Sequence, residues 1–183
     1  MKKHLLAFID TETTGLDITK HEIVEIGGVI VSQSWDDPTN PVFEIVDEFE
    51  FKVKPERIGD ADPVALRVNG YDPSAWIFAY TLSEAMQLLA QKTKGAIMVG
   101  HNICFDFAFL EKAFIDTGVE NTMHYHKLDT ISIAFAKLTT VEGIDKYSLR
   151  FLCEYFGIEN RNAHTALSDA RATFALYKKL MLR

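Results

Sequence analysis

The order of the apolar segments is the feature of this sequence that most restricts its fold. Three segments with the length and the Ile and Val content of strands come first, and shorter strand-like segments then alternate with helical patterns. We expect strands over residues 5–10, 22–32, 42–53, 96–100 and 127–130, and helices over residues 83–95, 103–116, 131–138, 149–156 and 166–181. A meander of three strands followed by such an alternation predicts an α/β fold, with a mixed central sheet and flanking helices.

The size of the chain indicates a single domain. Its 183 residues are 48% hydrophobic, which is enough to bury a core without disulfides or structural metals. We find no repeat or long linker, so the domain is expected to span residues 1–183. Cys104 and Cys153 lie in apolar segments and are expected to be buried, reduced thiols, which is typical of a cytoplasmic protein. No uncharged apolar stretch reaches the roughly 18 residues that a membrane-spanning helix needs, so we expect no membrane association.

The net charge of −7 argues against a protein that holds long duplexes, because such proteins present a basic face to the phosphates. The charge is compatible with a nuclease that grips only a strand end. Two divalent cations would add about +4 and bring the total to roughly −3, at the point where the substrate phosphate must lie.

Asp10 and Glu12 place two carboxylates at the end of the first predicted strand. A spacing of two residues in an extended chain directs both side chains to the same face. The strand is otherwise apolar, from Leu5 to Ile9. The alternative is that the strand simply runs into a turn, where Asp and Thr are common.

Asp106 is the only charged residue between Ile103 and Leu110. A lone buried carboxylate is unfavourable unless it is paired, protonated or bound to a metal. A helix cap or a buried ion pair would also explain it, although no basic residue follows before Lys112.

His164 and Asp169 are five residues apart, which on one continuous helix corresponds to about 140° and therefore to different faces. We expect His164 to precede the last helix, Thr165 to be its N-cap and Asp169 to lie in its first turns. Taken alone, the pair also fits a surface histidine and an aspartate that interacts with the helix dipole.

Together the four carboxylates of Asp10, Glu12, Asp106 and Asp169 indicate a metal site. Oxygen ligands of this kind favour Mg²⁺ or Mn²⁺, whereas thiolates or clustered imidazoles would indicate zinc. Two such cations about 4 Å apart can activate a water, hold a scissile phosphate and stabilise the leaving oxygen. His164 could then act as the general base.

The sequence resembles the DEDDh 3′–5′ exonucleases, a family that includes the proofreading epsilon subunit of bacterial DNA polymerase III. The three motifs that carry the resemblance occur in the family's order: Asp10-Thr-Glu-Thr-Thr-Gly-Leu, Gly100-His-Asn-Ile-Cys-Phe-Asp and His164-Thr-Ala-Leu-Ser-Asp. Pro63-Val-Ala-Leu-Arg-Val-Asn-Gly and Leu128-Asp-Thr are similar to further family segments, so the resemblance covers nearly the whole chain. It implies a ribonuclease H-like fold and the release of nucleoside monophosphates from 3′ ends.

The resemblance also implies roles for single residues. The four carboxylates would bind two divalent cations, Mg²⁺ or Mn²⁺, and His164 would be the general base. The terminal nucleotide would be contacted by Thr13, Gly15, Leu16, Asn102 and Phe105, with Leu16 as an apolar wedge against the bases.

The partners that the resemblance implies are a nucleic-acid 3′ end, with DNA expected ahead of RNA, and a DNA polymerase. The sequence ends at Arg183, so we expect none of the long C-terminal tail by which some proofreading subunits attach to a polymerase.

Three other functions remain open at this point. They are RNA trimming by an exoribonuclease of the same family, cleavage of internal phosphates by an endonuclease of similar fold, and non-catalytic binding of a nucleic-acid end. A metal site at His124 and His126 is not expected, because no cysteine or third histidine stands beside them in the sequence. Trp35, Trp76 and Tyr80 could stack on bases, but packing in the core or in loops is expected for each of them.

Overall fold

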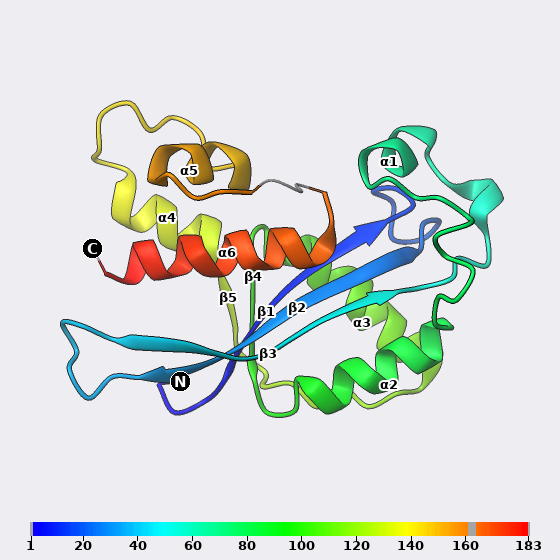
Figure 1. Cartoon of the computed structure of the whole chain (residues 1–183), viewed down its shortest axis with the longest axis horizontal. Coiled ribbons are helices and arrows are strands. Elements are labelled where there is room, and N and C mark those ends of the chain that lie inside the picture. Colours follow the sequence, from blue (N-terminus) through cyan, green and yellow to red (C-terminus); the bar gives the residue numbers. More distant parts are fainter. Residues whose placement is uncertain (1, 161–163, 183) are drawn as a thin grey trace.

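The centre of the protein is a mixed five-stranded sheet with the strand order β3-β2-β1-β4-β5 (Figure 1). The computed structural model describes residues 2–160 and 164–182. β1, β2 and β3 pair antiparallel, whereas β4 is parallel to β1 and β5 is parallel to β4. The first three strands therefore form the predicted meander. The strand bounds are β1 Leu6–Thr13, β2 Ile23–Ser34, β3 Val42–Lys52, β4 Ile97–Gly100 and β5 Lys127–Asp129.

Helices cover both faces of this sheet, as the sequence predicted. On one face α6 packs on β1 and β2, with α4 and α5 against it, while α2 and α3 cover the other face (Figure 1). Two short helices, η1 and α1, lie in the connection between β3 and α2. The helix bounds are η1 Ile58–Asp60, α1 Pro63–Val68, α2 Leu82–Lys92, α3 Ile103–Thr117, α4 Thr130–Leu138, α5 Leu149–Phe156 and α6 Ala166–Met181.

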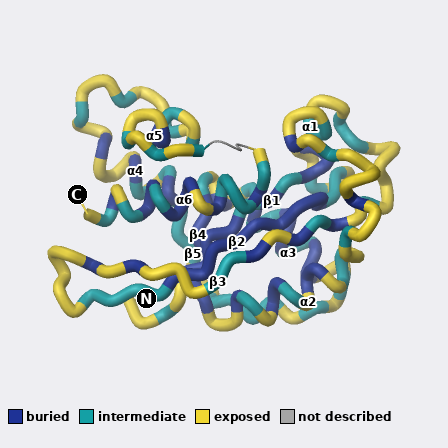
Figure 2. The backbone as a smooth tube through the Cα atoms, in the orientation of Figure 1, coloured by how far each residue is buried: buried dark blue, intermediate teal, exposed yellow. Residues whose placement is uncertain are grey.

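The alternation of side chains along β1 divides the core into two layers. Leu6 and Phe8 pack with residues of α6, whereas Ala7 and Ile9 pack beneath α2 and α3. Figure 2 shows this buried sheet between the helices, with the tip of the β2–β3 hairpin exposed. Because the period of a strand is two residues, the same alternation directs the next even-numbered side chains toward the α6 layer.

Several helix ends follow from local sequence. Thr81 and Glu84 form a reciprocal capping box at the start of α2, as expected for Thr and Glu three residues apart. The hydroxyl of Ser148 accepts the Phe151 N–H at the start of α5, and Gly157 ends that helix with a left-handed φ of 63°. They flank the predicted helix over residues 149–156.

Three features differ from the sequence-based expectations. No helix or strand was predicted over residues 63–68, yet they form α1, because Asp62 accepts the Val64 N–H and Pro63 occupies the first turn. β1 continues to Thr13 instead of ending at residue 10. Cys104 was expected to be buried but is exposed, since α3 packs on the sheet through other positions; Cys153 is buried as expected.

No helix within residues 2–160 and 164–182 combines the length and the apolar composition that crossing a membrane requires.

Candidate active site

Asp10 and Glu12 lie in the second half of β1, where this strand extends past its neighbour β4. β4 pairs with β1 only from Leu6 to Phe8, whereas β2 accompanies β1 as far as Thr13. One edge of β1 is therefore free of strand pairing beside both carboxylates. Both side chains continue the row of Phe8 and face the layer that α6 covers.

Asp106, in the first turn of α3, lies at this free edge of β1. Its Oδ1 accepts hydrogen bonds from the Thr11 backbone N–H at 2.9 Å and from the Thr11 hydroxyl at 2.8 Å. The residue is only 3% exposed. The N-cap of α3 is Asn102, and among the described residues no basic side chain pairs with Asp106. Neither a helix cap nor a buried ion pair therefore explains this carboxylate.

Asp169 and His164 meet at the start of α6, as their spacing predicted. His164 lies in the turn before the helix, is exposed, and has a left-handed φ of 73°. Its backbone N–H donates to Asp169 Oδ2 at 3.1 Å, while the Asn160 side chain donates to Asp169 Oδ1 at 2.6 Å. Thr165 is the N-cap, although its side chain makes no capping hydrogen bond.

Burial and mutual repulsion perturb the carboxylates at this end of the sheet. Burial, followed by repulsion from Asp169 and neighbouring acidic groups, raises the pKa of Glu12 to about 8. Burial raises the pKa of Asp106 to about 7, although the two hydrogen bonds from Thr11 oppose the shift. The pKa of Asp10 lies well above its ordinary value, first because of burial and then because of repulsion from Asp106, Asp169 and Glu12. Such crowding of like charges is the arrangement that a bound cation would relieve.

The donor set fits a divalent cation. Ligand atoms of Glu12, His164 and Asp169 all lie within 4.8 Å of one another, and the charges of Asp10 and Asp106 act on the same group. The first turns of α3 and α6, which carry Asp106 and Asp169, direct the positive ends of two helix dipoles toward this point. Carboxylate oxygens dominate the set, as hard cations require.

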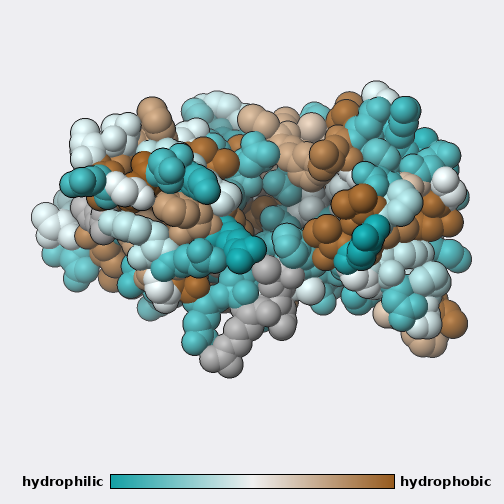
Figure 3. Space-filling model, turned by 90° about the horizontal axis from the view of Figure 1, so that it is seen from above, coloured by the Kyte–Doolittle hydropathy of each residue, from teal (hydrophilic) through white to brown (hydrophobic). Residues whose placement is uncertain are grey.

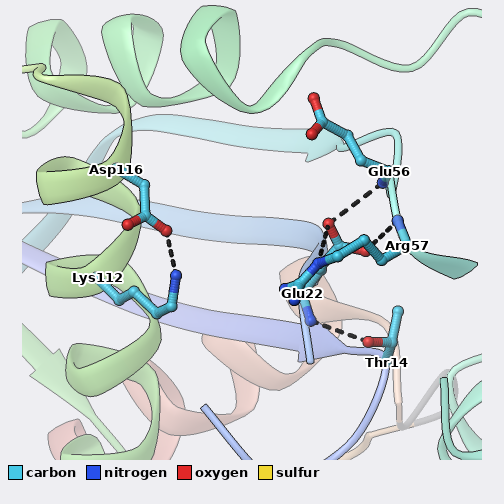
Figure 4. A network of polar contacts seen from close by, with 6 residues as sticks. All are labelled: Thr14, Glu22, Glu56, Arg57, Lys112 and Asp116. Atoms are coloured by element: carbon cyan, nitrogen blue, oxygen red, sulfur yellow. Dashed lines mark hydrogen bonds and ion pairs between the residues drawn. The ribbon is translucent and has the colours of Figure 1, made fainter. Parts of the chain in front are cut away.

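The loop that follows β1 is anchored by Glu22, as Figure 4 shows. The Thr14 N–H donates to the Glu22 carbonyl at 2.8 Å, and the Glu22 N–H donates to the Thr14 hydroxyl at 2.9 Å. The Glu22 carboxylate accepts the backbone N–H groups of Arg57 at 2.7 Å and Glu56 at 3.3 Å, and pairs with the Arg57 guanidinium. Both ends of the loop over residues 15–21 are therefore fixed.

This loop presents Leu16 to solvent. The Thr13 hydroxyl donates to the Gly15 carbonyl at 2.7 Å, and Thr13 is 6% exposed, so its side chain shapes the loop. A Cβ at Gly15 would lie 2.4 Å from the His21 ring, which explains a glycine there. Leu16 is 81% exposed, an unusual position for a large apolar side chain.

Asn102 and Phe105 lie at the start of α3, next to Asp106. Asn102 is exposed and has a left-handed φ of 65°, and its backbone N–H donates to Asp129 Oδ1 at 2.9 Å. Phe105 is half-buried, with its ring 5.0 Å from that of Phe109. Figure 3 views the molecule from above and shows a hollow between the region of α1 and that of α5, with apolar and polar side chains along it.

Sequence reasoning did not name Glu25, a further buried acidic residue near the site. It is 2% exposed, pairs directly across the strands with Glu12, and accepts the Ala166 N–H at 2.8 Å. The signal was present, because Glu25 is a lone charge in the apolar segment 23–31. Asn160 and Thr11, which hydrogen-bond two of the predicted ligands, had no comparable signal.

A cavity of about 550 Å³ lies elsewhere, between the β3 end, α2 and α3, and is lined by Glu22, Arg57 and Lys112 among others. None of the predicted catalytic residues lines it. Trp76 is buried and donates to the Val24 carbonyl at 2.8 Å, so it packs as expected.

Residues 7–177 match the model of a protein family described as exonuclease. The chain belongs to this exonuclease family. It is similar to the PolC-type DNA polymerase III of Caldanaerobacter subterraneus subsp. tengcongensis, with 30% identity over 174 residues, which cover 94% of this chain and 11% of that protein. It is also similar to the DNA polymerase III subunit epsilon of Treponema pallidum, with 27% identity over 172 residues, 94% of this chain and 74% of that subunit.

Solved structures of exonuclease I confirm the fold. The complex of E. coli exonuclease I with a dT13 oligonucleotide superposes with a TM-score of 0.77 at 20% identity, over 98% of this chain and 41% of that one. A zinc-bound form of the E. coli exonuclease I–ssDNA complex has a TM-score of 0.77 at 19% identity, over 98% and 41% of the two chains. The fold of this exonuclease-family enzyme is therefore ribonuclease H-like, whereas the chain spans only about a tenth of its PolC-type relatives.

Proposed function

We propose that this chain removes nucleotides one at a time from the 3′ end of single-stranded or frayed DNA. The observation that carries the proposal is the convergence of Glu12, Asp169 and His164 within 4.8 Å at the end of β1, with Asp10 and Asp106 beside them, in a chain of the exonuclease family. These five residues are the proposed catalytic group.

The four carboxylates of this group are the proposed ligands of two divalent cations, Mg²⁺ or Mn²⁺. Support comes from the oxygen-rich donor set and from the raised pKa values of Asp10, Glu12 and Asp106, which ligation would reverse. When bound, such cations supply charge stabilisation for an attacking water and a leaving 3′ oxygen.

His164 is the proposed general base. It is exposed and lies outside the helix, so its ring can turn toward a water beside Glu12 without disturbing the core. Asp169 holds the His164 backbone by accepting its N–H. The proton of the attacking water would pass to a ring nitrogen of His164 and from there to solvent.

The terminal nucleotide is proposed to lie along Leu16, Gly15, Thr13, Asn102 and Phe105. The exposed side chain of Leu16 would stack against the last bases and separate a frayed end from its complement, because burying an apolar surface there is favourable. Asn102, exposed at the start of α3, would contact the strand beside the scissile phosphate.

DNA is the proposed substrate because the relatives are DNA polymerase III proteins and because similar exonuclease I structures were solved with DNA oligonucleotides. A DNA polymerase is by the same reasoning a proposed partner. RNA trimming is the second candidate, since the fold alone does not discriminate against a 2′-OH.

The test is digestion of matched, 5′-labelled DNA and RNA oligonucleotides in the presence of Mn²⁺ or Mg²⁺. We expect stepwise shortening of DNA with a free 3′ end, none with a blocked 3′ end, and slower degradation of RNA. Equal cleavage of blocked strands would identify an endonuclease, and binding without any cleavage would identify a non-catalytic module. The Asp169→Asn variant should be inactive, whereas Asp116→Asn, at an exposed position on α3, should retain activity.

A further inference from the structure

Glu25 connects β2 to the first turn of α6. Its Oε1 accepts the backbone N–H of Ala166 at 2.8 Å, and its Oε2 lies 3.4 Å from Lys52 Nζ. Contacts of a carboxylate with a free helix N–H are strong because the first N–H groups of a helix have no partner within it. At 2% exposure, this carboxylate has little contact with water.

The contact with Glu25 supplies an acceptor for the N–H of Ala166, the first residue of α6. Thr165 is in the N-cap position, but its side chain makes no capping hydrogen bond. A capping side chain accepts the N–H of the second or third helical residue, so the acceptor for the Ala166 N–H comes from a strand 141 residues away in the sequence.

Gly27 lets the same helix turn approach the strand closely. A Cβ at Gly27 would lie 2.1 Å from the Leu167 backbone nitrogen and 2.2 Å from the Ala166 carbonyl carbon. Gly27 and Glu25 are two residues apart on β2 and so share one face. The turn of α6 that begins at Ala166 therefore packs on Glu25 and Gly27, which are successive positions on one face of β2.

Strand pairing places Glu25 and Gly27 opposite two of the proposed ligands on β1. Glu25 is paired across the strands with Glu12, and Gly27 is paired with Asp10. At the start of α6, the Asp169 N–H donates to the Thr165 carbonyl, and the Asp169 carboxylate accepts the His164 N–H. A displacement of the first turn of α6 would therefore move Asp169 and His164 together and change their distances from Asp10 and Glu12.

We propose that Glu25 is a positioning residue, which holds the start of α6 through its hydrogen bond to Ala166 and thereby sets the distance between Asp169 and Glu12. It acts on Asp169 and His164 through the helix, in addition to the repulsion between its charge and the carboxylates of Asp10 and Glu12. This inference rests on the proposed function of the site, because the distance matters only where these carboxylates share cations.

The experiment compares the wild type with Glu25→Ala, Glu25→Gln and Glu48→Ala. Glutamine keeps an oxygen acceptor for the Ala166 N–H but removes the charge. Glu48 is the matched control, because it also connects the sheet to α6, through two contacts of 2.7 and 2.8 Å with Arg171, but farther from the helix start. Amide exchange of Ala166 is measured by NMR in the metal-free proteins, Mn²⁺ binding by EPR titration, and kcat and KM with labelled single-stranded DNA.

For Glu25→Ala we expect the Ala166 amide to exchange at least about 10-fold faster, Mn²⁺ affinity to fall about 10-fold and kcat to fall by a similar factor with KM unchanged. Glu25→Gln should restore most of each value, and Glu48→Ala should match the wild type. Thermal unfolding of every variant identifies any protein that has lost its fold. If Glu25→Ala does not fold, the comparison of Glu25→Gln with the wild type tests the proposal.

Wild-type Mn²⁺ affinity and kcat in Glu25→Ala would overturn the proposal. A Gln variant as defective as the Ala variant would show that the charge of Glu25, and not its hydrogen bond, is required, and an equal defect in Glu48→Ala would show a general effect of helix docking; either result would also overturn it. Failure of the proposed function is a separate outcome, because it would appear as an inactive wild type whose Ala166 amide is still protected.

Discussion

Asp106 accepts two hydrogen bonds from Thr11, one from the backbone N–H at 2.9 Å and one from the hydroxyl at 2.8 Å. Both bonds end on the same carboxylate oxygen, Oδ1. The pair joins the first turn of α3 to β1 beyond the point where β4 ends.

Removing the Thr11 hydroxyl should therefore disturb Asp106 without moving it far. In Thr11→Val we expect a loss of about 1 kcal/mol in the free energy of unfolding, since one buried hydrogen bond disappears. The pKa of Asp106 should rise, because that bond now lowers it, and the acidic limb of the pH–rate profile should move to higher pH. Thr11→Ser keeps the hydroxyl and should behave as the wild type. An unchanged profile in Thr11→Val would contradict the assignment of Asp106 as a ligand.

Asp106→Asn should lower activity and raise the stability of the metal-free protein. We expect activity to fall at least about 100-fold, because a proposed ligand of the cations is lost. The metal-free protein should unfold at a higher temperature than the wild type, since a buried charge that repels Asp10 has been removed. Asp116→Asn, on the exposed side of the same helix, should change neither quantity by much. Calorimetry in EDTA and the oligonucleotide assay measure the two effects.

The stability of the metal-free protein should fall as the pH rises. Glu12 has a folded-state pKa of about 8 against an unfolded value of about 4.3, so between these values the folded state holds more protons than the unfolded state. The free energy of unfolding then decreases with pH across this window and levels off above it. Melting temperatures measured in EDTA from about pH 5 to about pH 9 test the sign. Saturating Mn²⁺ should remove the slope, because bound cations keep the carboxylates ionised.

Leu16→Ala should alter substrate preference and leave the fold intact. Leu16 is 81% exposed, so its truncation should change the free energy of unfolding by less than about 0.5 kcal/mol. Digestion of single-stranded DNA should persist, whereas digestion of paired 3′ ends should slow several-fold, because the separation of the last base pair loses its apolar contact. The ratio of the two rates is the measurement, and an unchanged ratio would remove Leu16 from the proposed strand path.

Gly27→Ala and Gly28→Ala should have different effects, although the residues are adjacent. A Cβ at Gly27 meets the backbone of α6, whereas a Cβ at Gly28 meets the Phe49 ring on the opposite face. We expect Gly27→Ala to weaken Mn²⁺ binding as well as stability, and Gly28→Ala to reduce stability by about 1–3 kcal/mol with Mn²⁺ binding retained. Binding titrations on both folded variants test this difference.

Secondary structure was largely predictable because the periodic patterns and the caps agree with each other. α6 begins and ends at the predicted residues 166 and 181, and α5 follows Ser148 and precedes Gly157 as expected. α1 was not predicted, because its six residues contain no full amphipathic repeat and glycines and prolines surround it. The end of β1 was placed too early, since the polar residues after Ile9 resemble a turn in sequence and only the pairing with β2 shows a strand.

The candidate site was predictable as a set of residue types and less so as a geometry. A charge in an apolar segment pointed to Asp106, and the same rule applies to Glu25, which went unnamed. Its partner, the Ala166 N–H, is a backbone group 141 residues away, and no side-chain pattern marks such a partner. The distances between Glu12, His164 and Asp169 depend on how α6 packs on the sheet, and no local pattern in the sequence specifies that packing.

Because β1 extends past β4, its acidic end is held along one edge by pairing with β2 and along the other by side chains, through the hydrogen bonds of Thr11 with Asp106 and of Thr13 with Asn69. Isolated hydrogen bonds of this kind break before a continuous ladder of strand hydrogen bonds does. On gentle warming without metal, we therefore expect this end of β1 to open and its amides to lose protection while the rest of the sheet is still intact.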